Sequence, residues 1–250
     1  MPRRSRLCIE GLPLHIIQRG NNKSACFFSD ADRILYLDLL REISMRHGCA
    51  VHAYVLMTNH VHLLLTPHEK ASASLLMKNL GQRFVQFINR KHVRSGSMWE
   101  GRFRSSVVDS ATYLLTCQRY IESNPVRAAM VDGPADYPWS SYGTNALGEP
   151  SQLVVPHDGY LRLGNDDESR LVAYRRLFGV PLDQSELEKI RNAANGGFAL
   201  GSKAFLERLE RATGSRVSRG IPGRPRRKDD EAQTTLSRLE EKRGLSPVLV

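Results

Sequence analysis

The sequence has little that would place it in a membrane or outside the cell. None of its apolar runs reaches the roughly 18 residues that a membrane-spanning helix needs. The basic start, residues 1–6, is followed by only a short apolar stretch, broken by Glu10 and Pro13, so we expect no secretory signal. The four cysteines show no C-x-x-C spacing, which argues against a disulfide framework and a cysteine zinc site. We therefore expect a cytoplasmic protein with no membrane partner.

Acidic residues are also in deficit. The 250 residues include 26 acidic and 36 basic side chains, which gives a net charge of +10 and a pI near 9.7. The excess lies in two segments: residues 78–104 carry a net +6 and residues 211–228 carry +7, while the remainder sums to about −3. Localised positive charge is typical of a nucleic-acid groove and a basic arm. Taken alone, the first segment could instead be a solvent-exposed helix face and the second a tail that only aids solubility.

Hydrophobic periodicity predicts a strand, a helix, a hairpin of two strands, a helix, a strand and a third helix, in that order. The expected ranges are 12–18, 29–47, 50–57 with 61–66, 72–88, 104–108 and 110–123. The first six elements match the split βαβ, or ferredoxin-like, pattern of an α+β fold, an antiparallel sheet with helices on one face. Short helices are expected near 168–178, 184–192 and 203–212. We therefore predict a domain over 1–145, a small helical extension over 146–213, and a basic tail over 214–250 that is disordered until a partner binds.

His60-Val61-His62 is the sharpest local pattern. On a strand, residues i and i+2 point to the same face about 6.5 Å apart, so both imidazoles can reach one metal ion while Val61 enters the core. Two histidines at this spacing are more often a coincidental or hydrogen-bonded pair. The pattern alone leaves both interpretations open.

A second cluster lies at the end of the third predicted helix. Tyr120 and Asn124 are i and i+4, so a phenol and a side-chain carbonyl can face the same point. The alternative is a half-buried aromatic and a helix C-cap before Pro125. Taken alone, this cluster favours the structural alternative.

Together the clusters resemble a known family. Residues 57–64 (MTNHVHLL), 99–103 (WEGRF) and 120–128 (YIESNPVRA) are similar, in content and order, to the single-tyrosine HUH transposases and, more narrowly, to the REP-associated tyrosine transposases. The resemblance covers about residues 13–142. It implies a ferredoxin-like enzyme that nicks and rejoins single-stranded hairpin DNA through a covalent 5′-phosphotyrosine.

The resemblance also implies residue roles. Tyr120 would be the nucleophile, and His60, His62 and Asn124 would hold a divalent ion, Mg or Mn. Many relatives carry Gln in place of this Asn. A nucleotide cofactor is not expected, because the reaction can reverse without ATP and the sequence contains no P-loop. The alternatives are a catalytically inactive DNA-binding regulator on the same fold and a metal-dependent phosphoesterase that uses an activated water.

Basic and amide side chains are the candidates for DNA binding. Phosphates attract arginine and lysine, and side chains in the loop after the first strand can reach bases. Residues 222–226 (PGRPR) contain the Gly-Arg-Pro core of AT-hook-like segments. The candidates are Arg19, Asn21, Asn22, Arg83, Arg90, Lys91, Arg102, Arg104, Arg224, Arg226 and Arg227. We expect a nucleoid-associated protein; monomer and homodimer both remain open.

Overall fold

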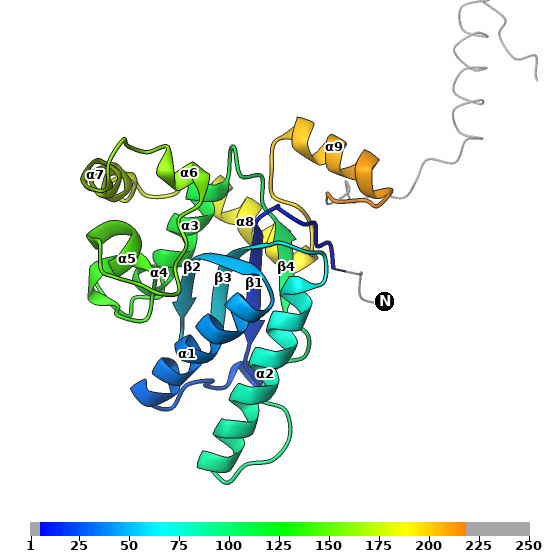
Figure 1. The fold of residues 1–250 in the computed structure, drawn as a ribbon, viewed down its shortest axis with the longest axis vertical. Helices are drawn as coiled ribbons and strands as arrows, with labels where there is room; N and C mark the ends of the chain where they lie inside the picture. Colours follow the sequence, from blue (N-terminus) through cyan, green and yellow to red (C-terminus); the bar gives the residue numbers. More distant parts are fainter. Residues whose placement is uncertain (1–5, 219–250) are drawn as a thin grey trace, which may run out of the picture. The chain divides into compact units, whose positions relative to one another are not determined.

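A four-stranded antiparallel sheet is the centre of the fold in the computed structural model, which describes residues 6–218 (Figure 1). The strands are β1 (Leu14–Arg19), β2 (Cys49–Leu56), β3 (His60–Pro67) and β4 (Arg104–Val107), in the order β2-β3-β1-β4. This order and the antiparallel pairing of each neighbour confirm the predicted α+β, ferredoxin-like arrangement.

Two long helices cover one face of the sheet. They are α1 (Asp30–Arg46) and α2 (Ser72–Lys91), and Figure 1 shows both on the same side. Alternate residues of β3, namely Val61, Leu63 and Leu65, are buried in the core beneath them. The prediction that Val61 enters the core is confirmed, since its side chain is fully buried.

Later helices cover the second face, where the prediction of helices on one face was incomplete. These are α3 (Leu114–Glu122) and α8 (Gln184–Gly196). Ala53, Val55 and Leu64 form a second buried cluster with residues of these helices, among them Ile190. Because alternate strand positions on this side are apolar too, this face also has to be shielded from water.

The remaining elements are short. They are η1 (Asn21–Lys23), α4 (Asn124–Arg127), η2 (Pro134–Asp136), α5 (Tyr142–Leu147), α6 (Asp158–Leu161), α7 (Asp167–Leu177) and α9 (Lys203–Thr213). The helices α7, α8 and α9 lie where the sequence predicts them. In the described part of the chain, no helix is long and apolar enough to cross a membrane.

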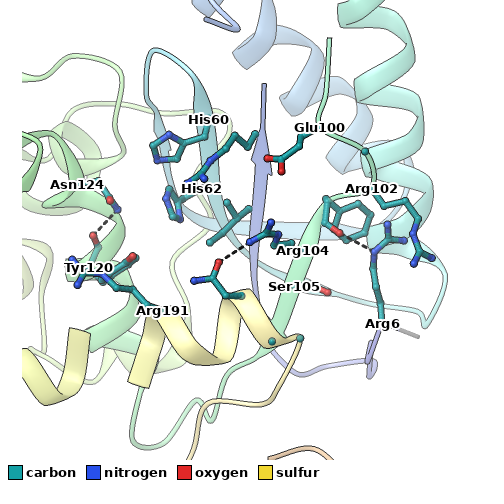
Figure 2. A pocket seen from close by; sticks show the side chains of 17 residues that line it. Arg6, His60, His62, Glu100, Arg102, Arg104, Ser105, Tyr120, Asn124 and Arg191 are labelled. Atoms are coloured by element: carbon teal, nitrogen blue, oxygen red, sulfur yellow. Dashed lines mark hydrogen bonds between the residues drawn. The ribbon is translucent and has the colours of Figure 1, made fainter. Parts of the chain in front are cut away.

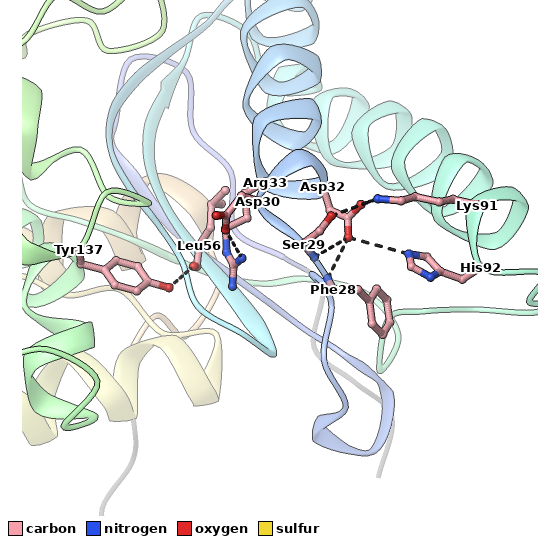
Figure 3. A network of polar contacts seen from close by, with 9 residues as sticks. All are labelled: Phe28, Ser29, Asp30, Asp32, Arg33, Leu56, Lys91, His92 and Tyr137. Carbon is pink, nitrogen blue, oxygen red and sulfur yellow. Dashed lines mark hydrogen bonds and ion pairs between the residues drawn. The ribbon is translucent and has the colours of Figure 1, made fainter.

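A polar network fixes the start of α1 against the end of α2 (Figure 3). The buried carboxylate of Asp32 accepts hydrogen bonds from the backbone N–H groups of Phe28 and Ser29, at 2.9 and 3.0 Å. The ammonium of Lys91 lies 2.6 Å from the same carboxylate. Lys91 therefore links the two helices and supplies the charged partner that the buried carboxylate needs.

The packed structure continues past the predicted start of the tail at residue 214. Val217 is only 2% exposed and belongs to the main core. Its carbonyl accepts a hydrogen bond from the Ala199 N–H at 2.8 Å. Of the predicted tail, residues 219–250 lie outside the described residues, and so does the expectation of disorder there.

Candidate active site

His60 and His62 lie at the start of β3, on the face opposite α1 and α2. Their ring centroids are 5.0 Å apart, as expected for alternate residues of one strand. The Nδ1 atom of His60 lies 2.7 Å from Oδ1 of Asn59, and Nδ1 of His62 lies 2.8 Å from Nε2 of His15. In both histidines Nδ1 is therefore hydrogen-bonded to a neighbouring side chain, and Nε2 is the nitrogen that could bind a ligand.

Burial keeps these imidazoles neutral. Loss of solvation, together with the positive charge of Arg19, lowers the pKa of His60 to about 4. Loss of solvation also holds the pKa of His62 well below its usual range, and the neighbouring His15 lowers it further. The neutral form is the one that binds a metal ion.

Tyr120 comes from α3 on the second face of the sheet. Its ring meets those of His15 and His62 edge-on, with centroids 5.8 and 5.9 Å away. The guanidinium of Arg127 lies 4.5 Å from the centre of the Tyr120 ring. Only 5% of the residue is exposed, and that part contributes to a cleft. The structure thus brings the predicted tyrosine to the predicted histidine pair.

Asn124 follows one turn later, and Figure 2 shows it beside Tyr120. The third predicted helix, 110–123, ends close to its expected position: α3 ends at Glu122, and the short helix α4 begins separately at Asn124. The Asn124 amide N–H₂ donates to the carbonyls of Tyr120 and Ile121, at 2.8 and 3.2 Å. This is the capping role of the structural alternative. These two hydrogen bonds use the N–H₂ group of Asn124 and fix the orientation of its amide. Oδ1, the atom that a metal ion would need, accepts neither of them.

These donors fit a divalent ion. The fit rests on two neutral imidazole nitrogens and one amide oxygen, all from residues that line the same cleft. In the described residues, no group of three or more His, Cys, Asp or Glu side chains is arranged to hold a metal. An ion at this position would therefore depend on Asn124 as its third protein ligand.

The cleft has a volume of about 540 Å³ (Figure 2). It extends from the histidines and Tyr120 past β1 and β4. Among the residues that the structure describes, its lining includes five arginines and one carboxylate, that of Glu100. The arginines are Arg6, Arg19, Arg102, Arg104 and Arg191. Such a lining attracts phosphate groups.

The structure brings three of the predicted DNA-binding residues to this cleft, Arg19, Arg102 and Arg104. Asn21 and Asn22 are exposed in η1 and do not line it. The α2 residues Arg83, Arg90 and Lys91 belong to the helix on the opposite face of the sheet. Arg83 pairs there with Glu42 at 2.7 Å. Arg224, Arg226 and Arg227 lie outside the described residues.

Sequence reasoning did not assign His15, Arg6, Arg191 or Asn195 to the site. His15 alternates with core residues on β1, and its contact with His62 follows from the pairing of β1 with β3. Arg191 and Asn195 lie in α8, far from the motifs in sequence. Two exposed polar residues four positions apart, on the side of a helix opposite its buried apolar residues, are an ordinary surface pattern. Only the packing of α8 therefore reveals that Arg191 and Asn195 line the cleft.

Comparisons with known proteins find a family match and similar solved structures. Residues 8–124 match the family model for IS200-like transposases. A REP-associated tyrosine transposase bound to a REP hairpin superposes with a TM-score of 0.51 at 16% identity, over 63% of this chain and 93% of its own. A crystallised candidate transposase from Deinococcus radiodurans gives a TM-score of 0.34 at 22% identity, over 49% of this chain and 97% of its own. No curated protein matches the chain.

Proposed function

We propose that this chain cleaves and rejoins single-stranded hairpin DNA through a phosphotyrosine on Tyr120. The match of residues 8–124 to the family model for IS200-like transposases supports this choice. The observation that carries the proposal is the convergence of Tyr120, His60 and His62 at one end of an arginine-lined cleft. The solved relative in complex with a REP hairpin supports the choice of a hairpin substrate.

In the proposed reaction, the phenolic oxygen of Tyr120 attacks the scissile phosphorus. The bond from phosphorus to the tyrosine oxygen forms as the bond from phosphorus to the 3′ oxygen breaks, which leaves the 5′ phosphate on the tyrosine. The phenol gives up its proton, and the 3′ oxygen takes up one proton to leave as a hydroxyl. A later attack by a 3′ hydroxyl reverses the step and releases Tyr120, so rejoining needs no nucleotide energy. The guanidinium of Arg127 over the Tyr120 ring adds positive charge beside the attacking residue.

His60, His62 and Asn124 would hold the divalent ion that the family implies, Mg or Mn. When bound, the ion supplies Lewis-acid polarisation of the scissile phosphate. Asn59 orients the imidazole of His60, and His15 orients that of His62, each by a hydrogen bond at the Nδ1 atom of the ligand histidine. The capping bonds of Asn124 restrict its amide to one orientation.

The proposal is tested by incubating the full chain with a labelled hairpin oligonucleotide and Mg²⁺ or Mn²⁺. We expect a covalent adduct that survives denaturing electrophoresis and is absent from Tyr120→Phe, because phenylalanine lacks the attacking oxygen. Adduct formation by Tyr120→Phe at the wild-type level would refute the role of Tyr120.

The same assay separates two other functions. A DNA-binding regulator without activity would bind the hairpin and leave it intact in every variant. A phosphoesterase that uses an activated water would cleave the hairpin without forming an adduct, and Tyr120→Phe would still cleave. Removal of the ion with a chelator is expected to stop cleavage while binding through the arginines persists.

A further inference from the structure

The helix α8 forms a wall of the cleft, although it lies beyond the part of the chain that matches the family. Its buried side contributes Ile190 and Ala193 to the cluster beneath the second face of the sheet. Its end is tied to β4, because Arg104 donates a hydrogen bond to Oδ1 of Asn195 at 2.8 Å. The chain after α8 also joins β4, where Leu200 N–H donates to the Val107 carbonyl at 2.7 Å.

These contacts determine which side of α8 faces the cleft. Arg191 and Asn195 are i and i+4, so they share a side of the helix, and both line the cleft. Ile190 and Ala194 are buried on another side. Figure 2 shows Arg191 extending from α8 toward the end of the cleft that holds Tyr120.

Arg191 has no fixed partner there. Within residues 6–218 it makes no ion pair and no hydrogen bond. By contrast, Arg6 donates to the Phe103 carbonyl at 3.0 Å and Arg104 donates to Asn195. All five donor groups of the Arg191 guanidinium are thus available to an incoming anion.

The charge around Arg191 indicates what that anion is. Arg19 and Arg102 also line the cleft, whereas Glu100 is the single carboxylate that residues 6–218 contribute to its lining. Gathering guanidinium groups in this way costs electrostatic free energy unless an anion binds between them. Guanidinium groups bind phosphate in bidentate fashion, and a chain of phosphates fits several such groups in succession.

We propose that Arg191 is a phosphate-binding residue for single-stranded DNA and holds the strand in the cleft next to Tyr120. The inference rests on the proposed function for the identity of the strand. It assigns α8, within the predicted extension 146–213, a direct part in substrate binding. The extension is then a component of the DNA site.

The test measures the affinity of a fluorescent hairpin oligonucleotide across a salt series, in full-length Tyr120→Phe protein so that no cleavage intervenes. Arg191→Ala is expected to weaken binding about tenfold at low salt, which corresponds to one lost hydrogen-bonded charge contact. It should also reduce the slope of log affinity against log salt by about 0.7, the value for one phosphate contact on a single strand.

Two further variants distinguish phosphate binding from a structural role. Lys189→Ala removes the same charge from an exposed position of α8 that does not line the cleft, so affinity and slope should stay near wild type. Arg191→Lys should restore most of the slope, whereas Arg191→Gln should behave like alanine. If Arg191→Ala keeps the wild-type slope, or if Lys189→Ala changes it equally, the inference is overturned.

Adduct formation, measured with Tyr120 present, keeps this result separate from the proposed function. If wild type forms no adduct but Arg191→Ala still flattens the salt slope, the proposed reaction fails and the phosphate contact stands. If wild type forms the adduct and Arg191→Ala leaves the slope unchanged, only the role of Arg191 fails.

Discussion

Glu122 lies two residues after the proposed nucleophile and faces the other way. Its carboxylate accepts hydrogen bonds from Ser141, Asn145 and Tyr174, at 2.6, 2.8 and 2.8 Å. Complete burial raises the pKa of Glu122 to about 7, although these three donors oppose the rise. Because the donors belong to α5, α7 and the residue before α5, Glu122 joins the helix that carries Tyr120 to the C-terminal helices.

This raised pKa predicts a pH dependence of stability that Glu122→Gln removes. Between the ordinary value of 4.5 and about 7, the folded protein keeps the carboxyl proton and the unfolded chain releases it. Raising the pH through that window therefore lowers the free energy of unfolding, by up to about 3 kcal/mol for this group.

Urea unfolding of both proteins at pH 5 and pH 7 measures this effect. The free energy of unfolding of Glu122→Gln, relative to that of wild type, should increase as the pH rises. The buried histidines have lowered pKa values and shift stability in the opposite direction, but their contribution is the same in both proteins and cancels in the difference. Glu168→Gln, at an exposed position in α7, serves as the control. Parallel curves for wild type and Glu122→Gln would show that Glu122 is already ionised at pH 5.

Individual residues of the site were predictable where the sequence constrains their geometry locally. The strand spacing of His60 and His62 and the helix spacing of Tyr120 and Asn124 each placed two side chains together. His15 was not predictable in this way, because its contact with His62 depends on strand register, which becomes visible only when β1 and β3 are paired.

At the scale of elements, Asp32 connects two helices through its buried carboxylate. We expect Asp32→Asn to lower the free energy of unfolding by about 3 kcal/mol, because it removes the charge opposite Lys91 and places an N–H₂ group among donors. Asp30→Asn, in the same turn but exposed, should cost less than about 1 kcal/mol. Denaturant unfolding compares the two, and equal losses would contradict a buried ion pair.

Most element boundaries followed from local signals. Gly48, with its φ of +59°, follows α1 as expected, and the hairpin of β2 and β3 turns at Thr58 and Asn59. The third helix begins later than predicted, at Leu114, because residues 110–113 form a turn. Periodicity located α8 as a helix but could not show which surface it covers, since packing between distant segments leaves no mark on local spacing.

At the scale of the whole molecule, a deletion that tests the basic tail should begin after Ser218 and not at the predicted boundary of 214, because Val217 is part of the core. Deletion of residues 219–250 removes five of the seven basic residues in 211–228 and leaves Val217 in the core. We expect weaker DNA binding and a shallower salt dependence, with about 0.7 lost from the slope for each phosphate contact removed. Adduct formation at saturating DNA should persist.

Binding titrations at several salt concentrations provide the measurement. A truncation before Gly214 is the comparison, because it also removes Val217 and should lower the free energy of unfolding by about 1–2 kcal/mol. A salt slope unchanged by deletion of 219–250 would show that this segment does not contact phosphates.

Charge at this scale was informative but misleading in detail. The positive segment 78–104 was expected to line a nucleic-acid groove, yet α2 holds part of it on the face of the sheet opposite the cleft, where Lys91 and Arg83 pair with carboxylates. Linear charge counts could not separate the two faces. The cleft receives only Arg102 and Arg104 from that segment among the described residues, and its other arginines come from the N-terminal stretch, from β1 and from α8.

The wall formed by α8 has a consequence for how the protein is made. His60, His62 and Tyr120 leave the ribosome before α8 does, and at about 5–20 residues per second the lag from Tyr120 to Gly197 is on the order of 4 to 15 s. During that interval the apolar face that α8 covers is open to water and to chaperones. The growing chain thus carries the proposed nucleophile for several seconds before it has the helix proposed to hold a strand against it.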